Sequence, residues 1–280
     1  ILDILPENTD CKTIVTLHGM YEIIDDYNLK TILPRLVKRS AKIVYTAEKN
    51  LIALQKNKLI KQADPVRIDN ALEITPFNPF DRSLLGIPED AFLLTLVSRA
   101  IPEKGWLEAI EAVTLAREQS GKEIHLILIG EGPIYSDLKK KKLSSFIHLE
   151  GFRINIRSYF ASSQMGFLPS RFHGESFPLV LIDCLQVGRP ILASSVGEIS
   201  YMLGTEDGDA GDLFDLDNWK IPVTDLANRI ARLATDIHYY RKLLDKAPVA
   251  AKKFNPELLK ENYHTVYSSV LSTTETQHTE

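Results

Sequence analysis

The chain has 280 residues, of which 44% are hydrophobic and 25% are charged, so it is long enough for one large or two modest soluble domains. Its net charge of -4 argues against a nucleic-acid-binding protein, which usually carries a basic surface. Two distant cysteines, Cys11 and Cys184, give no disulfide framework, and no apolar run is long enough for a membrane-spanning helix. We expect no signal peptide at the start of the given sequence, because no basic region followed by a long apolar stretch stands there.

Short apolar runs alternate with helical patterns along most of the chain. The runs predict buried strands at 13–17, 42–46, 92–97, 124–129, 146–149, 165–168 and 190–193. Helices are expected between them at 29–39, 47–58, 104–118, 135–142, 157–162, 179–187 and 219–235. Strands that alternate with helices at this spacing predict an α/β fold with a mostly parallel, doubly wound sheet.

The most informative segment runs from Phe167 to Leu203, where a strand end leads through a loop into a helix. A doubly wound sheet binds phosphates and sugars at such a place, because backbone N–H groups meet there at the positive end of a helix dipole. Glu175 and Asp183 are separated by seven residues. One carboxylate would therefore lie in the loop and the other about two turns along the helix, where they suit hydroxyls on two different rings.

This segment resembles the C-terminal domain of the group 1 (family 4) glycosyltransferases. That family typically carries a Glu, seven residues and a second Glu after a Pro-Ser pair, and here Pro169-Ser170 and Glu175 are followed by Asp183 in place of the second Glu. Four more segments resemble the family in the same order along the chain, at 97–105, 129–133, 150–153 and 196–199. Five ordered matches are far more specific than a lone glycine fingerprint.

The resemblance implies a GT-B-like α/β fold, with a complete C-terminal Rossmann-like donor domain and the rear part of an N-terminal Rossmann-like domain. Residues 1–72 would form the partial acceptor-side domain and residues 73–252 the nucleotide-sugar-binding domain. Residues 253–271 would form a helix that packs back towards the N-terminal part, and residues 272–280 are expected to be a disordered tail. Because the strand before His18 lies well inside the family's first domain, we expect about half of the acceptor domain to be missing.

The resemblance also implies roles for single residues. Arg99 and Lys104 would grip the donor diphosphate and stabilise the negative charge of the leaving group, without a divalent metal. Glu175 would bind hydroxyls of the donor sugar, Asp183 would bind the ribose, and His18 would face the sugar from the acceptor domain. The candidate catalytic residues are therefore His18, Arg99, Lys104 and Glu175. The other candidate donor-binding residues are Gly130, Phe152, Arg153, Ser176, Phe177, Pro178 and Leu179, with Phe152 and Arg153 bordering the base.

The implied function is retaining transfer of a sugar from a nucleoside-diphosphate sugar to a glycan, lipid or other acceptor, in polysaccharide biosynthesis. We expect the donor and a glycan or lipid-linked acceptor as partners, no nucleic acid, no cofactor and no metal. The expected location is the cytoplasm, with peripheral contact at the inner face of the membrane left open. The alternative is a non-catalytic nucleotide-sugar-binding module, or an inactive fragment of such an enzyme.

Several local alternatives stay open in the sequence. The strings at 207–209 and 215–217 are of the Asp-x-Asp type that holds a metal in other glycosyltransferases, but we interpret them as turns. His173 is either structural or on the acceptor side, and Phe152 either stacks on a base or packs in the core. Pro178 stands where the family often has Gly, and it supplies no N–H donor.

Overall fold

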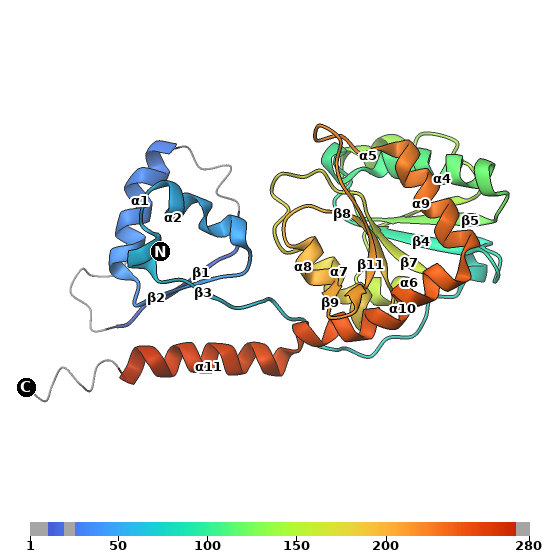
Figure 1. Ribbon diagram of the computed structural model, residues 1–280. Coiled ribbons are helices and arrows are strands. Elements are labelled where there is room, and N and C mark those ends of the chain that lie inside the picture. Colours follow the sequence, from blue (N-terminus) through green and yellow to red (C-terminus); the bar gives the residue numbers. More distant parts are fainter. Residues whose placement is uncertain (1–10, 20–25, 273–280) are drawn as a thin grey trace, which may run out of the picture. The chain divides into compact units, whose positions relative to one another are not determined.

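The computed structural model describes residues 11–19 and 26–272. Contacts divide the chain into two compact units (Figure 1). The smaller unit takes the chain up to Ala71 together with the chain from Phe254, and the larger unit is the continuous stretch Leu72–Lys253. Within the described ranges, no helix has both the length and the apolar character needed to cross a membrane.

The smaller unit contains a parallel sheet in the order β1-β2-β3. Its strands are β1 (Ile14–Leu17), β2 (Lys42–Tyr45) and β3 (Val66–Arg67). Its helices before residue 72 are α1 (Asp26–Arg39), η2 (Glu48–Leu51), α2 (Ile52–Lys56) and α3 (Ile60–Ala63). Leu33 and Val37, one turn apart on α1, share an apolar core with Ile43 of β2 and Leu54 of α2.

The long helix α11 (Pro256–Ser272) covers the other face of this sheet. Val44 follows Ile43 along β2, so the two side chains point to opposite faces, and Val44 packs with Ile68 and with Val266 of α11. Both faces of the strand are thereby buried, as parallel strands require. The last residue of α11 is Ser272, where we expected the tail to begin, and the rest of that tail lies outside the described residues.

The larger unit contains a six-stranded parallel sheet in the order β11-β8-β7-β4-β5-β6. Its strands are β4 (Phe92–Val97), β5 (Ile124–Ile129), β6 (Ile147–Gly151), β7 (Met165–Leu168), β8 (Ile191–Ser194) and β11 (Gly211–Phe214). The apolar runs of β4 and β5 match this position, since central strands of a parallel sheet are covered on both faces.

Helices cover both faces of this sheet (Figure 1). They are α4 (Trp106–Ser120), α5 (Pro133–Leu138), α6 (Ile156–Ser162), α7 (Leu179–Gln186), α8 (Ile199–Leu203), α9 (Val223–Thr235) and α10 (Ile237–Ala251). This unit also contains the 3-10 turns η3 (Arg82–Leu85) and η4 (Pro102–Lys104), and the 3-10 turn η5 (Lys252–Phe254) crosses the boundary between the two units in the sequence. Leu94 and Leu96 of β4 share a core with α4 and α9, whereas Leu93, on the opposite face, clusters with Tyr159 of α6.

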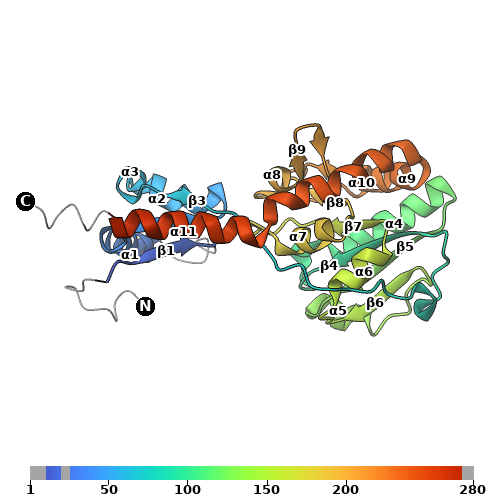
Figure 2. The same cartoon turned by 90° about the horizontal axis from the view of Figure 1, so that it is seen from below.

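A small hairpin, formed by β9 (Gly204–Thr205) and β10 (Gly208–Asp209), lies beside α10 (Figure 2). Lys246 of α10 donates a hydrogen bond to the carbonyl oxygen of Asp207. The acidic string at 207–209 therefore lies at the tip and on one arm of a hairpin, in agreement with its interpretation as a turn.

One sequence-based expectation for this region was wrong, and one helix was missed. The helix expected at 219–235 begins only at Val223, because residues 217–220 form a tight turn in which Asp217 and Lys220 exchange backbone hydrogen bonds. The helix α10 was not expected at all.

Candidate active site

The strand order creates a switch point between β4 and β7. From β4 the chain moves outward to β5 and β6, and then returns to the other side of β4 to form β7 and β8. The loops that leave the carboxyl ends of β4 and β7 therefore diverge, and an open α/β sheet binds its ligands in the crevice between such loops. The two segments that carry most of the predicted donor-binding residues are these two loops.

The loop after β4 carries the two predicted cations. Arg99 is exposed, and its guanidinium lies 5.3 Å from the centre of the Phe172 ring. Lys104, at the end of η4, has 8% of its surface exposed, and its ammonium lies 5.0 Å from the centre of the same ring. One aromatic ring from the loop after β7 thus contacts both cations, an arrangement in which the ring face attracts positive charge.

The loop after β7 brings Glu175 onto Lys104. The Nζ atom of Lys104 donates to Oε2 of Glu175 at 2.5 Å, and only 7% of the surface of Glu175 is exposed. Both charges are thus largely removed from water, which is costly unless they are paired as they are here. The structure therefore joins a predicted phosphate-binding cation and a predicted sugar-binding carboxylate in one buried pair.

Backbone contacts fix the position of Glu175. A β-turn at residues 172–175 is closed by a hydrogen bond from the amide of Glu175 to the carbonyl oxygen of Phe172, 2.9 Å long. On the following side, a Cβ atom on Gly197 (φ +60°) would lie 2.5 Å from the carbonyl oxygen of Glu175, so only glycine allows this approach. The amide of Glu198 donates to the carbonyl oxygen of Ser176.

The other predicted donor-binding residues of this segment surround the start of α7. Pro178 precedes the first residue of that helix, Phe177 is buried and Leu179 is 44% exposed. Gly130 follows β5 with φ +135°, and a Cβ atom there would lie 1.9 Å from the carbonyl oxygen of Ser98. Glycine at this position thus lets the loops after β4 and β5 approach each other.

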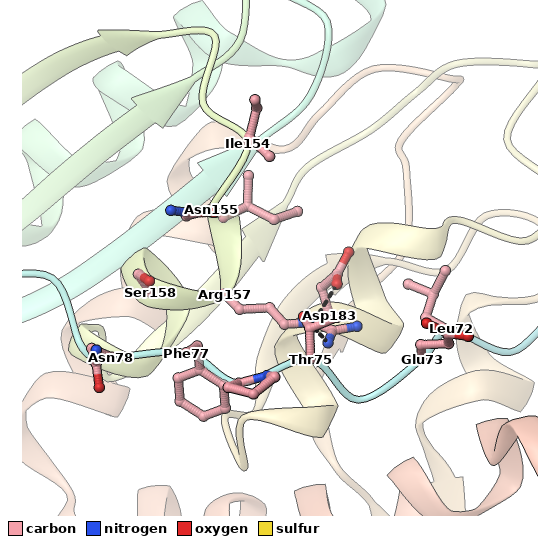
Figure 3. A pocket seen from close by; sticks show the side chains of 12 residues that line it. Leu72, Glu73, Thr75, Phe77, Asn78, Ile154, Asn155, Arg157, Ser158 and Asp183 are labelled. Carbon is pink, nitrogen blue, oxygen red and sulfur yellow. Dashed lines mark hydrogen bonds and ion pairs between the residues drawn. The ribbon is translucent and has the colours of Figure 1, made fainter.

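Asp183 has partners that its sequence position does not reveal. Its Oδ1 atom accepts a hydrogen bond of 2.7 Å from Nε of Arg157, a residue of α6, whose Nη1 donates to the hydroxyl of Thr75 (Figure 3). Burial raises the pKa of Asp183, and the guanidinium of Arg157 opposes that shift. The side chains of Asp183 and Arg157 line a cleft of 730 Å³ together with residues 72–73, 75–78, 154–156 and 158, and its lining does not include Arg99, Lys104 or Glu175.

The loop after β6 places Phe152 and Arg153 beside each other. Phe152 is 66% exposed, so the option that it packs in the core is wrong. Arg153 is held by Glu150, at 2.9 Å from its Nη2 atom, and by the hydroxyl of Tyr159, at 3.0 Å from its Nε atom. Both residues line a second cleft, of 500 Å³, that also includes Asn155.

His18 belongs to the smaller unit, where it is exposed and directly follows β1. His173 stacks on Trp219, with ring centres 4.2 Å apart and planes 7° from parallel.

Three residues that the motif analysis did not single out complete this region: Phe172, Arg157 and Trp219. Phe172 lies between Pro169-Ser170 and Glu175 of the motif, which was its only signal, because its two cations stand 73 and 68 positions earlier in the chain. Arg157 and Trp219 lie outside that motif, and their partners are 26 and 46 to 48 positions away in the chain.

Comparison with known families gives a match in the larger unit. The sequence model described as "Glycosyl transferases group 1" matches residues 91–236, which is slightly more than half of the chain. The match extends from the residue before β4 through α9 and includes both loops of the switch point.

Curated relatives are similar at low identity. The chain is 26% identical over 172 residues to UDP-Gal:alpha-D-GlcNAc-diphosphoundecaprenol alpha-1,3-galactosyltransferase of Escherichia coli, an alignment of 56% of this chain and 44% of that protein. It is 24% identical over 274 residues to N-acetyl-alpha-D-glucosaminyl L-malate synthase of Bacillus anthracis, covering 93% of this chain and 68% of that protein. The chain therefore spans about half to two thirds of the length of these two relatives.

Solved structures agree on the fold. The Anabaena protein HepE in complex with UDP superposes with a TM-score of 0.78 at 19% identity, over 92% of this chain and 72% of that one. The pneumococcal O-GlcNAc transferase GtfA, in complex with UDP and GlcNAc, gives a TM-score of 0.67 at 17% identity, over 93% of this chain and 53% of that one. These likenesses confirm the expected GT-B-like fold.

Proposed function

The chain belongs to the family of group 1 glycosyl transferases, and from that premise we propose that its larger unit binds a nucleoside-diphosphate sugar whose sugar is transferred, with retention of configuration, to a glycan or lipid-linked acceptor. The observation that carries the proposal is the buried pair of Lys104 and Glu175 at the switch point of the sheet. Lys104 supplies a cation for the diphosphate, and Glu175 supplies a carboxylate for the sugar hydroxyls. The two groups must be neighbours, because in the donor the sugar is bonded directly to the diphosphate.

The charges of the crevice suit the chemistry of the leaving group. When the bond between sugar and phosphate breaks, negative charge grows on the nucleoside diphosphate, and cations already fixed in the crevice stabilise it without reorganising. Arg99 and Lys104 supply these charges in the proposal, and no divalent metal is needed. The sugar then passes through an oxocarbenium-like state, which a hydroxyl of the acceptor attacks from the face that the departing phosphate leaves, while its proton passes to that phosphate.

Three relatives support the substrate classes. HepE was crystallised with UDP and with UDP-glucose, so a donor with a nucleoside diphosphate is the natural expectation for this fold. The E. coli relative is named for a lipid diphosphate acceptor, and a Bacillus subtilis relative is named poly(glycerol-phosphate) alpha-glucosyltransferase. We extend these classes to this chain as the proposed donor and acceptor, with action in the cytoplasm or at the inner face of the membrane.

A direct assay tests the proposal. The chain is incubated with UDP-, GDP- and ADP-linked sugars, and both binding and the release of nucleoside diphosphate are measured with and without candidate acceptors. The matched control is Glu175→Gln, which keeps the shape of the side chain and removes its charge. Release that depends on Glu175 supports a transferase, binding without release supports a non-catalytic nucleotide-sugar-binding module, and no binding by the parent protein contradicts both.

A further inference from the structure

The tight turn at residues 217–220 places a tryptophan where the backbone favours glycine. Asn218 has φ +48° and Trp219 has φ +62°, so both central residues of this two-residue turn are left-handed. Such turns prefer Asn followed by Gly, because a bulky side chain is strained in the left-handed region. Asn218 fits this preference and Trp219 does not, so contacts of the indole ring must hold the residue in this conformation.

Those contacts fall on the loop that carries Glu175. The indole stacks face to face on His173, and its Nε1–H group donates a 2.8 Å hydrogen bond to the carbonyl oxygen of Arg171. His173 is the second residue of the 172–175 turn whose last residue is Glu175. The indole therefore contacts the residue before this turn and a residue within it.

The same loop is also held by η4. The amide of Arg171 donates to the carbonyl oxygen of Glu103 at 2.8 Å, and Glu103 is followed by Lys104, the partner of Glu175. After Trp219 the chain enters the core at Ile221, which is 7% exposed. The loop is thus held by contacts with η4 and with the 217–220 turn, and Trp219 makes the contacts from the turn.

We propose that Trp219 is a positioning residue for recognition of the donor sugar. It holds the 172–175 turn so that the carboxylate of Glu175 is aligned with the sugar hydroxyls, while the diphosphate is held by Arg99 and Lys104. This inference rests on the proposed function, because it assigns the sugar to Glu175. It follows that Trp219 contributes to the difference in affinity between the nucleoside-diphosphate sugar and the nucleoside diphosphate. It contributes little to the affinity for the nucleoside diphosphate alone.

The test compares Trp219→Gly with Asn218→Gly. Both variants place glycine, which adopts the left-handed conformation freely, at a central position of the same turn, but only Trp219→Gly removes the indole. Trp219→Phe is the conservative variant, since it keeps an aromatic ring and loses the N–H donor. Melting temperatures of all three variants establish that the fold is retained.

Calorimetry then measures binding of UDP, GDP and ADP and of their glucose, galactose and N-acetylglucosamine conjugates. We then take the conjugate that the parent protein binds most tightly, together with its own nucleoside diphosphate. The readout is the ratio of the affinity for this conjugate to the affinity for this diphosphate. Trp219→Gly should lower this ratio by roughly ten-fold, the effect of a misplaced hydrogen bond to a charged group. Asn218→Gly should leave it unchanged, and Trp219→Phe should restore part of it.

The possible failures are distinguishable. If the parent protein binds none of these compounds, the proposed function is wrong and this inference with it. If the parent binds diphosphates but no conjugate more tightly, Glu175 does not recognise the sugar and the inference is wrong. If Trp219→Gly keeps the parent's ratio, weakens diphosphate and conjugate equally, or behaves like Asn218→Gly, only the positioning role of Trp219 is overturned.

Discussion

At the scale of single residues, Arg99 and Lys104 should contribute to the same binding step and differ in their effect on stability. Each change to Ala should weaken a nucleoside diphosphate by about 1.5–3 kcal/mol, because each removes a charge-assisted hydrogen bond, and should affect the nucleoside far less. Lys104→Ala should also lower the free energy of unfolding by about 3 kcal/mol, since it leaves the Glu175 carboxylate buried without a partner. Arg99 is exposed, so its removal should leave stability unchanged.

Urea unfolding and calorimetry measure these two effects separately. The control is the double variant Lys104→Met with Glu175→Gln, which removes both charges and should recover much of the lost stability without recovering diphosphate affinity. Equal losses for diphosphate and nucleoside would show that the two cations act on folding or on another site.

Asp183 is the clearest departure from the family pattern, and its contact with Arg157 sharpens the prediction for it. If Asp183 binds the ribose, Asp183→Asn should cost about 1–2 kcal/mol of nucleotide affinity, because a neutral amide is a weaker acceptor. A 2′-deoxy analogue should lose affinity with the parent protein and much less with the Asn variant, as measured by calorimetry. Additive losses would mean that Asp183 does not touch the ribose and serves instead to hold Arg157.

At the scale of elements, β5 and β6 carry a buried pair of histidines. Nδ1 of His125 lies 3.0 Å from Nε2 of His148, and the rings stack with their centres 5.3 Å apart. One ring must donate and the other accept, so the contact requires that the two rings are not both protonated. Burial lowers the pKa of both residues, and that of His148 falls to about 4.

The pair predicts a loss of stability in mild acid. Unfolded histidine titrates near pH 6.5, so the unfolded chain binds more protons than the native protein between about pH 6.5 and 4. The contribution of His148 to the free energy of unfolding is therefore fully present above pH 6.5. It falls as the pH drops towards 4, by roughly 3 kcal/mol in total. Urea unfolding of the parent protein and of His148→Gln at pH 7 and pH 5 measures this loss of unfolding free energy. A parent protein that loses no more stability than the variant would contradict this role.

The strands β4, β5 and β7 have the predicted bounds, because apolar runs that end sharply leave little freedom in where a buried strand begins and ends. The helix α10 was missed although Asp236 caps it, because α9 ends only one residue before that cap. The start of α9 was misplaced because the turn around Trp219 depends on contacts with a loop 46 to 48 residues earlier.

The candidate site was predictable as a set of residues and not as a geometry. The motif selected Lys104 and Glu175 independently, but nothing local in a sequence shows that two residues 71 positions apart form an ion pair. The same reason hid Arg157. Its guanidinium meets Asp183 only because α6 and α7 pack against each other.

At the scale of the whole molecule, the proposed donor site should work without a divalent metal. Arg99 and Lys104 supply countercharge for the diphosphate, so the affinity for nucleoside diphosphate should barely change when a chelator replaces magnesium in calorimetry. The control titrates magnesium alone into the protein. A large loss of affinity on chelation would contradict this prediction, and the acidic strings at 207–209 and 215–217 would then be the candidate metal ligands.

The smaller unit takes its strands from one end of the described chain and its covering helix from the other, and this sets an order for folding during synthesis. A ribosome completes the continuous stretch Leu72–Lys253 before it has made α11, so the larger unit can fold while the sheet of the smaller unit still lacks one cover. Until α11 emerges, Val44 and Ile68 remain without Val266. A chain cut after Lys253 would thus combine the complete larger unit with a sheet that has an open apolar face, the kind of surface that chaperones recognise.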